Sequence, residues 1–248
     1  ELWGVTIRPE ISESSSLTDT VIYLENVNAG IFTLTKEEQN TFFPILKKRI
    51  FKELDDSFVD YELLHRAARG LYRFVGKGNE DADSAWKAAL KGVIDAELQR
   101  QGAYWQGNLV QTLSICQISP DSALWTPPGE TEPISLLVDG KTLIARLLES
   151  LCDENGKFVP LSEVNGETAY TFLEYNSYYQ KPAEGEVERN VATSHFCFPA
   201  LVAYDRFLNG KTAYNDFSDL DAPRPMPQNE PPLFTSDIRA ANPQLQQV

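Results

Sequence analysis

The chain has 248 residues, of which 42% are hydrophobic and 11% aromatic, and its formal net charge at pH 7 is −14. This apolar content can bury a substantial core, which argues against disorder throughout the chain. The acidic balance disfavours non-specific binding to DNA or to anionic membranes.

Three further features bear on where the protein works. The longest apolar run, residues 196–204, has nine residues, one of them proline, and is too short to span a membrane. The three cysteines, Cys116, Cys152 and Cys197, form no CxxC pair, and no Asn-x-Ser/Thr acceptor occurs, which favours a reducing environment over secretion. We therefore expect an intracellular or virion-associated protein, in which a targeting segment before Glu1 would not be visible.

The N-terminal segment has the pattern of β-structure. Residues 2–7 predict a short strand. Residues 20–25 and 31–34 flank the turn-rich segment 26–30 and predict a hairpin.

Residues 36–102 predict three helices. The first begins with the capping-box spacing of Thr35 and Glu38, and Pro44 predicts a kink or a restart within it. The other two are expected over residues 59–75 and 82–101.

The pattern becomes mixed after Gly102. Residues 109–118 and 134–138 have strand-like composition, and residues 142–151 predict a helix. Asn165-Gly166 predicts the turn of a hairpin. A short helix is expected over residues 199–208, with Pro199 at its first position.

The last 31 residues are rich in proline and poor in large apolar side chains, which predicts an extended arm. We therefore expect an α+β fold in which a helical layer, residues 36–102, packs with a mixed or antiparallel sheet. The expected boundaries are a single domain over residues 1–217 and an extended Pro-rich C-terminal arm over residues 218–248. An ordered arm must lie against its own domain or a neighbouring subunit.

Charge is distributed unevenly along the chain. Residues 36–101 carry twelve basic and twelve acidic residues, whereas residues 102–248 carry nine basic and nineteen acidic residues. More than half of the lysines and arginines therefore lie in about a quarter of the chain, which is where an anionic partner is expected to bind.

The sharpest candidate site is a basic stripe within the second predicted helix. Arg66, Arg69, Arg73 and Lys77 are spaced i, i+3, i+7 and i+11, which places them on one helical face. Arginine pairs bidentately with phosphate oxygens, so this face is a candidate nucleic-acid contact. Three lysines of the preceding helix extend the candidate surface: Lys47, Lys48 and Lys52. The alternative is an ordinary solvated helix face, because Glu62 lies four residues before Arg66.

Other constellations are weaker. Gly140-Lys141-Thr142 lacks the upstream glycine of a Walker A motif. Cys197 is a candidate nucleophile with His195, which would share a face with it on a strand, or with His65 as the activating base. Three aspartates could offer oxygens to a metal ion, although they lack the EF-hand glycine and glutamate: Asp216, Asp219 and Asp221. We assign no catalytic residue, metal ligand or cofactor from the sequence.

The leading functional hypothesis is a non-enzymatic assembly or binding subunit of a larger complex, such as a viral coat protein, a nucleoprotein or the backbone subunit of a ribonucleoprotein. In this hypothesis the basic face contacts nucleic-acid phosphates, and the arm docks on a neighbouring copy or another subunit. The partner-binding candidates are two loop tyrosines and three prolines of the arm: Tyr178, Tyr179, Pro223, Pro225 and Pro227.

Two alternatives stay open. One is a hydrolase or transferase that uses Cys197 and His195 or the aspartates at 216–221. The other is an acidic regulatory module that binds a basic partner protein. Convergence of the reactive groups would favour the enzyme, whereas salt-sensitive binding to a basic protein would favour the regulatory module.

Overall fold

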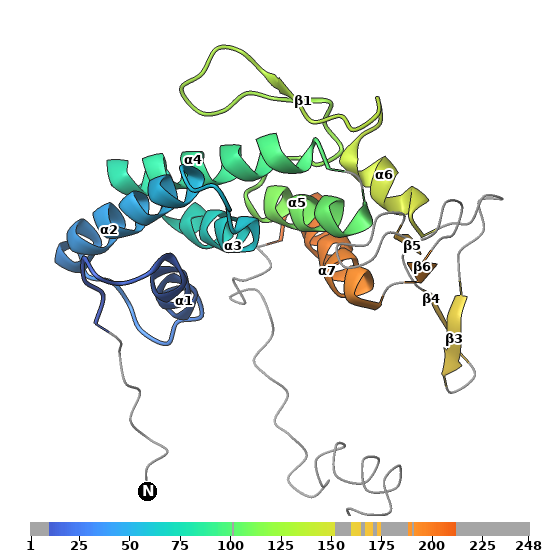
Figure 1. Ribbon diagram of the computed structural model, residues 1–248, viewed down its shortest axis with the longest axis horizontal. Helices are drawn as coiled ribbons and strands as arrows, with labels where there is room; N and C mark the ends of the chain where they lie inside the picture. The colour runs from blue at the N-terminus through green and yellow to red at the C-terminus, as the bar shows by residue number, and fades with distance from the viewer. Residues whose placement is uncertain are drawn as a thin grey trace, which may run out of the picture. The chain divides into compact units, whose positions relative to one another are not determined.

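The computed structural model describes residues 10–100, 102–151, 160–164, 167–170, 173–174, 188–189 and 191–211. This part of the chain is mostly helical (Figure 1). Its α helices are α1 Leu17–Asn28, α2 Lys36–Leu54, α3 Tyr61–Leu71, α4 Glu80–Glu97, α5 Ala103–Ile115, α6 Leu143–Glu149 and α7 Val191–Leu208, with a 3-10 turn η1 at Tyr72–Phe74.

The strands of the described residues are short and pair only two at a time, always antiparallel. The pairs are β1 Leu124–Trp125 with β2 Ile134–Ser135, β3 Pro160–Val164 with β4 Glu167–Tyr170, and β5 Leu173–Glu174 with β6 Glu188–Arg189. The expectation of an α+β fold thus holds only broadly, because the sheet content is minimal. The core is built from helices that pack on helices.

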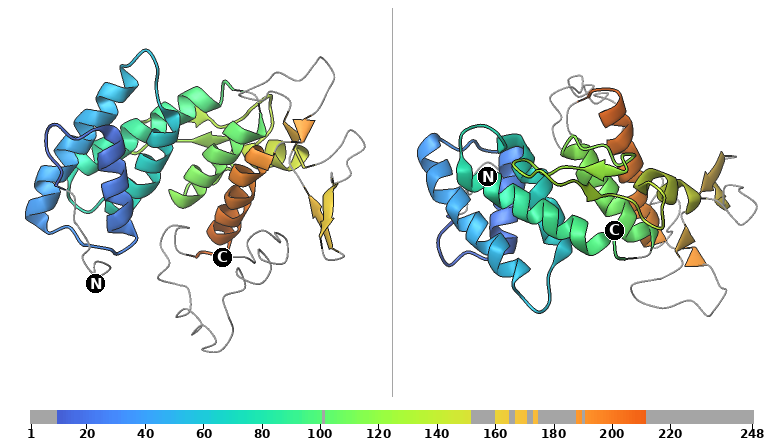
Figure 2. Two further views of the ribbon diagram at one scale, coloured as in Figure 1. Left: turned by 60° about the horizontal axis from the view of Figure 1, so that its bottom comes forward. Right: turned by 90° about the horizontal axis from the view of Figure 1, so that it is seen from above.

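The helical layer expected over residues 36–102 is present as α2, α3 and α4. Helix α3 packs against α1, α4 and α5, and α5 packs in turn against α6 and α7 (Figure 2). The capping box of Thr35 and Glu38 is confirmed: the Glu38 carboxylate accepts a hydrogen bond from the Thr35 backbone N–H at 2.7 Å. Helix α2 continues past Pro44 as one element, so of the two predictions made there the restart does not occur, and the kink stays a prediction.

The predicted hairpin at residues 20–34 is wrong, because this segment forms helix α1. Ser16 caps the helix with Asp19: the Asp19 N–H donates to the Ser16 hydroxyl, and the Asp19 carboxylate accepts from the Ser16 N–H. Val21 and Leu24 lie on its buried face. Thr20, Val21 and Val27 pack on the buried side of this capped helix, whereas Ile22 is exposed.

The strand expected over residues 109–118 is also wrong, because residues 103–115 form α5. Helix α5 is buried along nearly its whole length between α3, α4, α6 and α7. A helix covered on every side has no solvent-exposed face, so the alternation of polar and apolar faces that identifies surface helices is weak in its sequence.

Helix α7 is longer than expected and begins at Val191, with Pro199 inside it rather than at its first turn. Two local predictions are confirmed. Helix α6 begins after the cap residue Thr142, and β3 pairs with β4 in the hairpin predicted around Asn165-Gly166.

Several predictions lie outside the described residues. They concern the strand at residues 2–7, the domain boundary at 217, the C-terminal arm and the loop tyrosines Tyr178 and Tyr179. Among the helices that the structure describes, none has both the length and the apolar character to cross a membrane.

Candidate functional site

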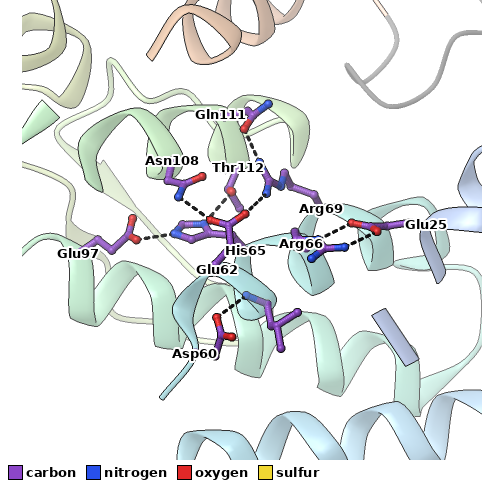
Figure 3. A network of polar contacts seen from close by, with 11 residues as sticks. Glu25, Asp60, Glu62, His65, Arg66, Arg69, Glu97, Asn108, Gln111 and Thr112 are labelled. Carbon is purple, nitrogen blue, oxygen red and sulfur yellow. Dashed lines mark hydrogen bonds and ion pairs between the residues drawn. The ribbon is translucent and has the colours of Figure 1, made fainter. Parts of the chain in front are cut away.

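The arginines of the predicted basic stripe meet partners within the fold. Helix α3 lies against both α1 and α5, so its polar side chains face other helices. Nε and Nη2 of Arg66 each donate to a different carboxylate oxygen of Glu25 on α1, both at 2.7 Å (Figure 3). This bidentate pair is the geometry in which arginine binds a carboxylate most strongly.

Arg69 is the most buried cation of the stripe, with 13% of its side chain exposed. Its guanidinium donates to the Gln111 amide oxygen of α5 and lies 3.8 Å from a Glu62 carboxylate oxygen. Burial lowers the pKa of Arg69, and the Glu62 carboxylate opposes that shift. Arg69 therefore connects α3 to α5 instead of facing solvent.

The single basic face does not form, because α3 ends at Leu71. Arg73 lies in η1, with its guanidinium 3.5 Å from the carbonyl oxygen of Asn28, and Lys77 is exposed in the turn beyond. Gly76 has a φ of 72°, a left-handed conformation that ends the helical path. The prediction of a helix through residue 75 was therefore wrong. The four basic residues do not lie on one continuous helical face.

The lysines of α2 also lie near acidic groups. Lys47 pairs with Asp81 at 2.9 Å, and Lys48 pairs with Glu13 at 2.7 Å, whereas Lys52 is exposed on the same helix. Hydrogen bonding and attraction from Lys48 lower the pKa of Glu13. A nucleic-acid phosphate at either paired lysine would compete with a carboxylate of the protein itself.

A buried polar network lies next to Arg69, where α3, α4 and α5 meet. Nε2 of His65 lies 2.6 Å from a carboxylate oxygen of Glu97, and Nδ1 lies 2.8 Å from the Thr112 hydroxyl (Figure 3). The Asn108 amide donates to Glu62 at 2.9 Å. Burial raises the pKa of Glu97, and the nearby His65 opposes that shift.

This network was not predicted from the sequence, although the sequence contains two signals for it. His65 interrupts the apolar face of α3, and Asn108, Gln111 and Thr112 recur at i, i+3 and i+4 within an otherwise apolar segment. A polar triplet at that spacing marks one face of a helix. Because residues 109–118 were predicted to form a strand, the helical spacing of these polar residues was not recognised.

Cys197 takes part in helix packing. Its thiol is fully buried and donates to the backbone oxygen of Ala103 at 3.2 Å. His65, the activating base considered for it, contacts Glu97 and Thr112 instead. The expectation that His195 and Cys197 share a face required a strand, and the segment is α-helical, where residues two apart do not face each other.

The aspartates at 216–221 and the arm prolines lie outside the described residues. Within the ranges that the structure covers, no group of three or more His, Cys, Asp or Glu side chains is placed to hold a metal ion.

A hollow of about 500 Å³ lies where α1 meets the first turns of α2. The rings of Tyr23 and Phe42, 5.0 Å apart between centroids, line it together with the carboxyl-bearing residues Glu10, Glu37 and Glu38. Both rings are nearly buried, whereas Glu10 and Glu37 are exposed. The exposed carboxylates can attract a cationic side chain by charge, and the nearly buried rings supply an apolar wall beside them.

No protein-family model, no curated protein and no solved structure matches the chain. Functional inference therefore depends on the geometry of these sites alone.

Proposed function

We propose that the chain is a non-enzymatic binding subunit that recognises a basic segment of a partner protein. The observation that carries this proposal is the hollow between α1 and α2, with exposed carboxyl groups at Glu10 and Glu37 and the rings of Tyr23 and Phe42 in its lining. A lysine or arginine side chain can place its aliphatic stem in the hollow and its charge near the carboxylates.

The distribution of ion pairs supports a basic partner more than a nucleic acid. Lys47, Lys48, Arg66 and Arg69 each lie within ion-pair distance of a carboxylate. The protein as a whole keeps a formal charge of −14. Such a field accelerates encounter with a basic surface and opposes approach of a polyanion.

The enzymatic alternative receives less support. Cys197 would need an accessible thiol to act as a nucleophile, and its side chain is fully buried. Assembly through the C-terminal arm stays a prediction, because residues 218–248 lie outside the described part of the chain.

Binding of a fluorescent decalysine peptide, measured by anisotropy at low and moderate salt, tests the proposal. The double variant Glu10→Gln/Glu37→Gln should weaken binding about three- to tenfold, since exposed charge pairs contribute roughly 0.2–1 kcal/mol each. The matched control Asp55→Asn/Glu132→Gln removes two exposed carboxylates elsewhere and should change affinity less than twofold.

Two outcomes would overturn the proposal. Equal loss in the hollow variant and the control would mean that only net charge attracts the peptide. Tighter binding to a ten-nucleotide oligouridylate than to decalysine would favour the nucleic-acid hypothesis instead. In that case the salt slope for RNA should be about −0.7 per phosphate contact, and neutralising Arg73, Lys77 and Lys52 should reduce it.

A further inference from the structure

One histidine, one glutamate and one threonine join three helices in the core. His65 belongs to α3, Glu97 is the last residue of α4, and Thr112 lies in α5. The side chains of His65 and Glu97 are both fully buried, with the 2.6 Å contact between them, and Thr112 is equally buried. Each helix therefore contributes one member of a chain of polar contacts that water does not reach.

Such a pair is most stable with one proton. An imidazolium beside a carboxylate and an imidazole beside a carboxylic acid both carry no net charge. Loss of the shared proton leaves a buried negative charge, and a second proton leaves a buried positive charge. Burial penalises both the anionic and the cationic form of the pair, so the form with one shared proton is favoured over either.

The surroundings do not compensate for a lost proton. The charges that act most strongly on Glu97, besides His65, are those of Arg100 and Glu62, which have opposite signs. The Arg100 guanidinium lies over the rings of Tyr61 and Trp105, at 4.6 and 4.2 Å from their centroids. Helix α5 faces the pair with the hydroxyl of Thr112, which is not ionisable in this range.

Both carboxylate oxygens of Glu97 are buried, and apart from the 2.6 Å contact of Oε1 with Nε2 of His65, neither has a polar partner among the described residues. A lone carboxylate in that position would therefore be poorly solvated. Burial already raises the pKa of Glu97, in the direction that this geometry requires.

We propose that His65, Glu97 and Thr112 form a pH-dependent latch that holds α3, α4 and α5 together while the pair keeps its shared proton. An exposed imidazole in an unfolded chain loses its proton at about pH 6.5. Above that pH the folded protein holds one proton more than the unfolded chain, so its stability falls as pH rises. The C-terminal end of α4 loosens first, because Glu97 ends that helix.

Urea unfolding between pH 6.0 and 8.5 tests the latch. The folding equilibrium constant of the wild type should fall about tenfold per pH unit above about pH 6.5, the slope of one linked proton. Glu97→Gln keeps a hydrogen-bond acceptor for His65 without a shared proton. Its constant should not fall over the same range, and should rise at most about fourfold as the unfolded imidazole loses its proton. The control Glu132→Gln alters an exposed carboxylate and should behave as the wild type does.

Two measurements on the wild type keep the proposal testable if Glu97→Gln does not fold. The carboxyl carbon resonance of Glu97 should titrate above pH 6, and amide exchange at residues 94–98, corrected for intrinsic rate, should accelerate between pH 6.0 and 8.5. Titration of that carbon near pH 4.5, or a wild-type pH dependence retained in Glu97→Gln, would overturn the latch.

Discussion

Two arginines one turn apart on α3 have different roles, although the sequence gives them the same appearance. Arg66 pairs with Glu25 at a partly open site, where the two side chains are 30% and 41% exposed. Arg69 is only 13% exposed and connects Glu62 to Gln111 of α5. The difference arises because α1 covers one edge of α3 and α5 covers the other.

Removing these two charges should therefore have unequal effects on stability. Arg69→Met keeps the aliphatic stem but leaves the Gln111 oxygen without its donor, and it should lower the free energy of unfolding by about 2 kcal/mol. Arg66→Met breaks a partly exposed pair and should cost at most about 1 kcal/mol. Urea denaturation at pH 7 measures both, with Arg73→Met as an exposed control.

Equal losses for the two variants would contradict the difference in burial. Unchanged stability in both would instead mean that these arginines are not structural, as both interpretations from the sequence, a phosphate contact or an ordinary solvated helix face, require.

At the scale of elements, the sequence correctly predicts those helix starts and hairpins that are determined by residues close together in the chain. The capping box at Thr35 and Glu38, the helix that starts near Thr142 and the hairpin of residues 160–164 and 167–170 are each specified by a few neighbouring residues. The structure contains that capping box, α6 and the pairing of β3 with β4. These signals act within one turn of the chain, so the remaining fold hardly alters them.

The wrong predictions concern segments whose secondary structure is determined by tertiary packing. Helix α5 is surrounded by other helices and shows only a weak amphipathic period, and α1 carries β-branched residues that favour strands in isolation. For the same reason, the sequence marks polar positions of the buried network but does not show which of them meet. His65, Glu97 and Thr112 are far apart in sequence, and only the packing of three helices brings them together.

Close approach of α5 and α7 depends on Gly107. A Cβ atom at this position would lie 3.0 Å from the Cys197 sulfur and 3.2 Å from its Cα. Gly107→Ala should therefore destabilise the protein by about 1–2 kcal/mol, because overpacking against backbone outweighs the roughly 1 kcal/mol that alanine contributes to a helix. Thermal unfolding followed by circular dichroism provides the measurement.

Gly92→Ala is the matched control within α4. Its Cβ would lie 2.5 Å from Cδ2 of Leu54, the end of a flexible side chain that can rotate away. The helix-propensity gain should then leave stability unchanged or slightly higher. Similar losses at both glycines would mean that the contact between α5 and α7 is no tighter than an ordinary side-chain contact.

At the scale of the whole molecule, the charge of −14 coexists with many local ion pairs. Salt screens the repulsion among the excess carboxylates, and it also screens the attraction within the exposed ion pairs. The two effects have opposite signs for stability. The net effect of salt on stability therefore shows which is larger, the attraction within the ion pairs or the repulsion among the excess carboxylates.

We expect the excess acid to dominate, because most of the pairs are partly exposed and each contributes little. Raising sodium chloride from 20 to 300 mM should increase the melting temperature by about 3 °C, the shift that corresponds to roughly 1 kcal/mol in a chain of this size. Glu10→Gln/Glu37→Gln carries two fewer negative charges and should gain less from salt. A melting temperature that falls with salt would mean that the ion pairs outweigh the repulsion, and the long-range field invoked for a basic partner would lose its basis.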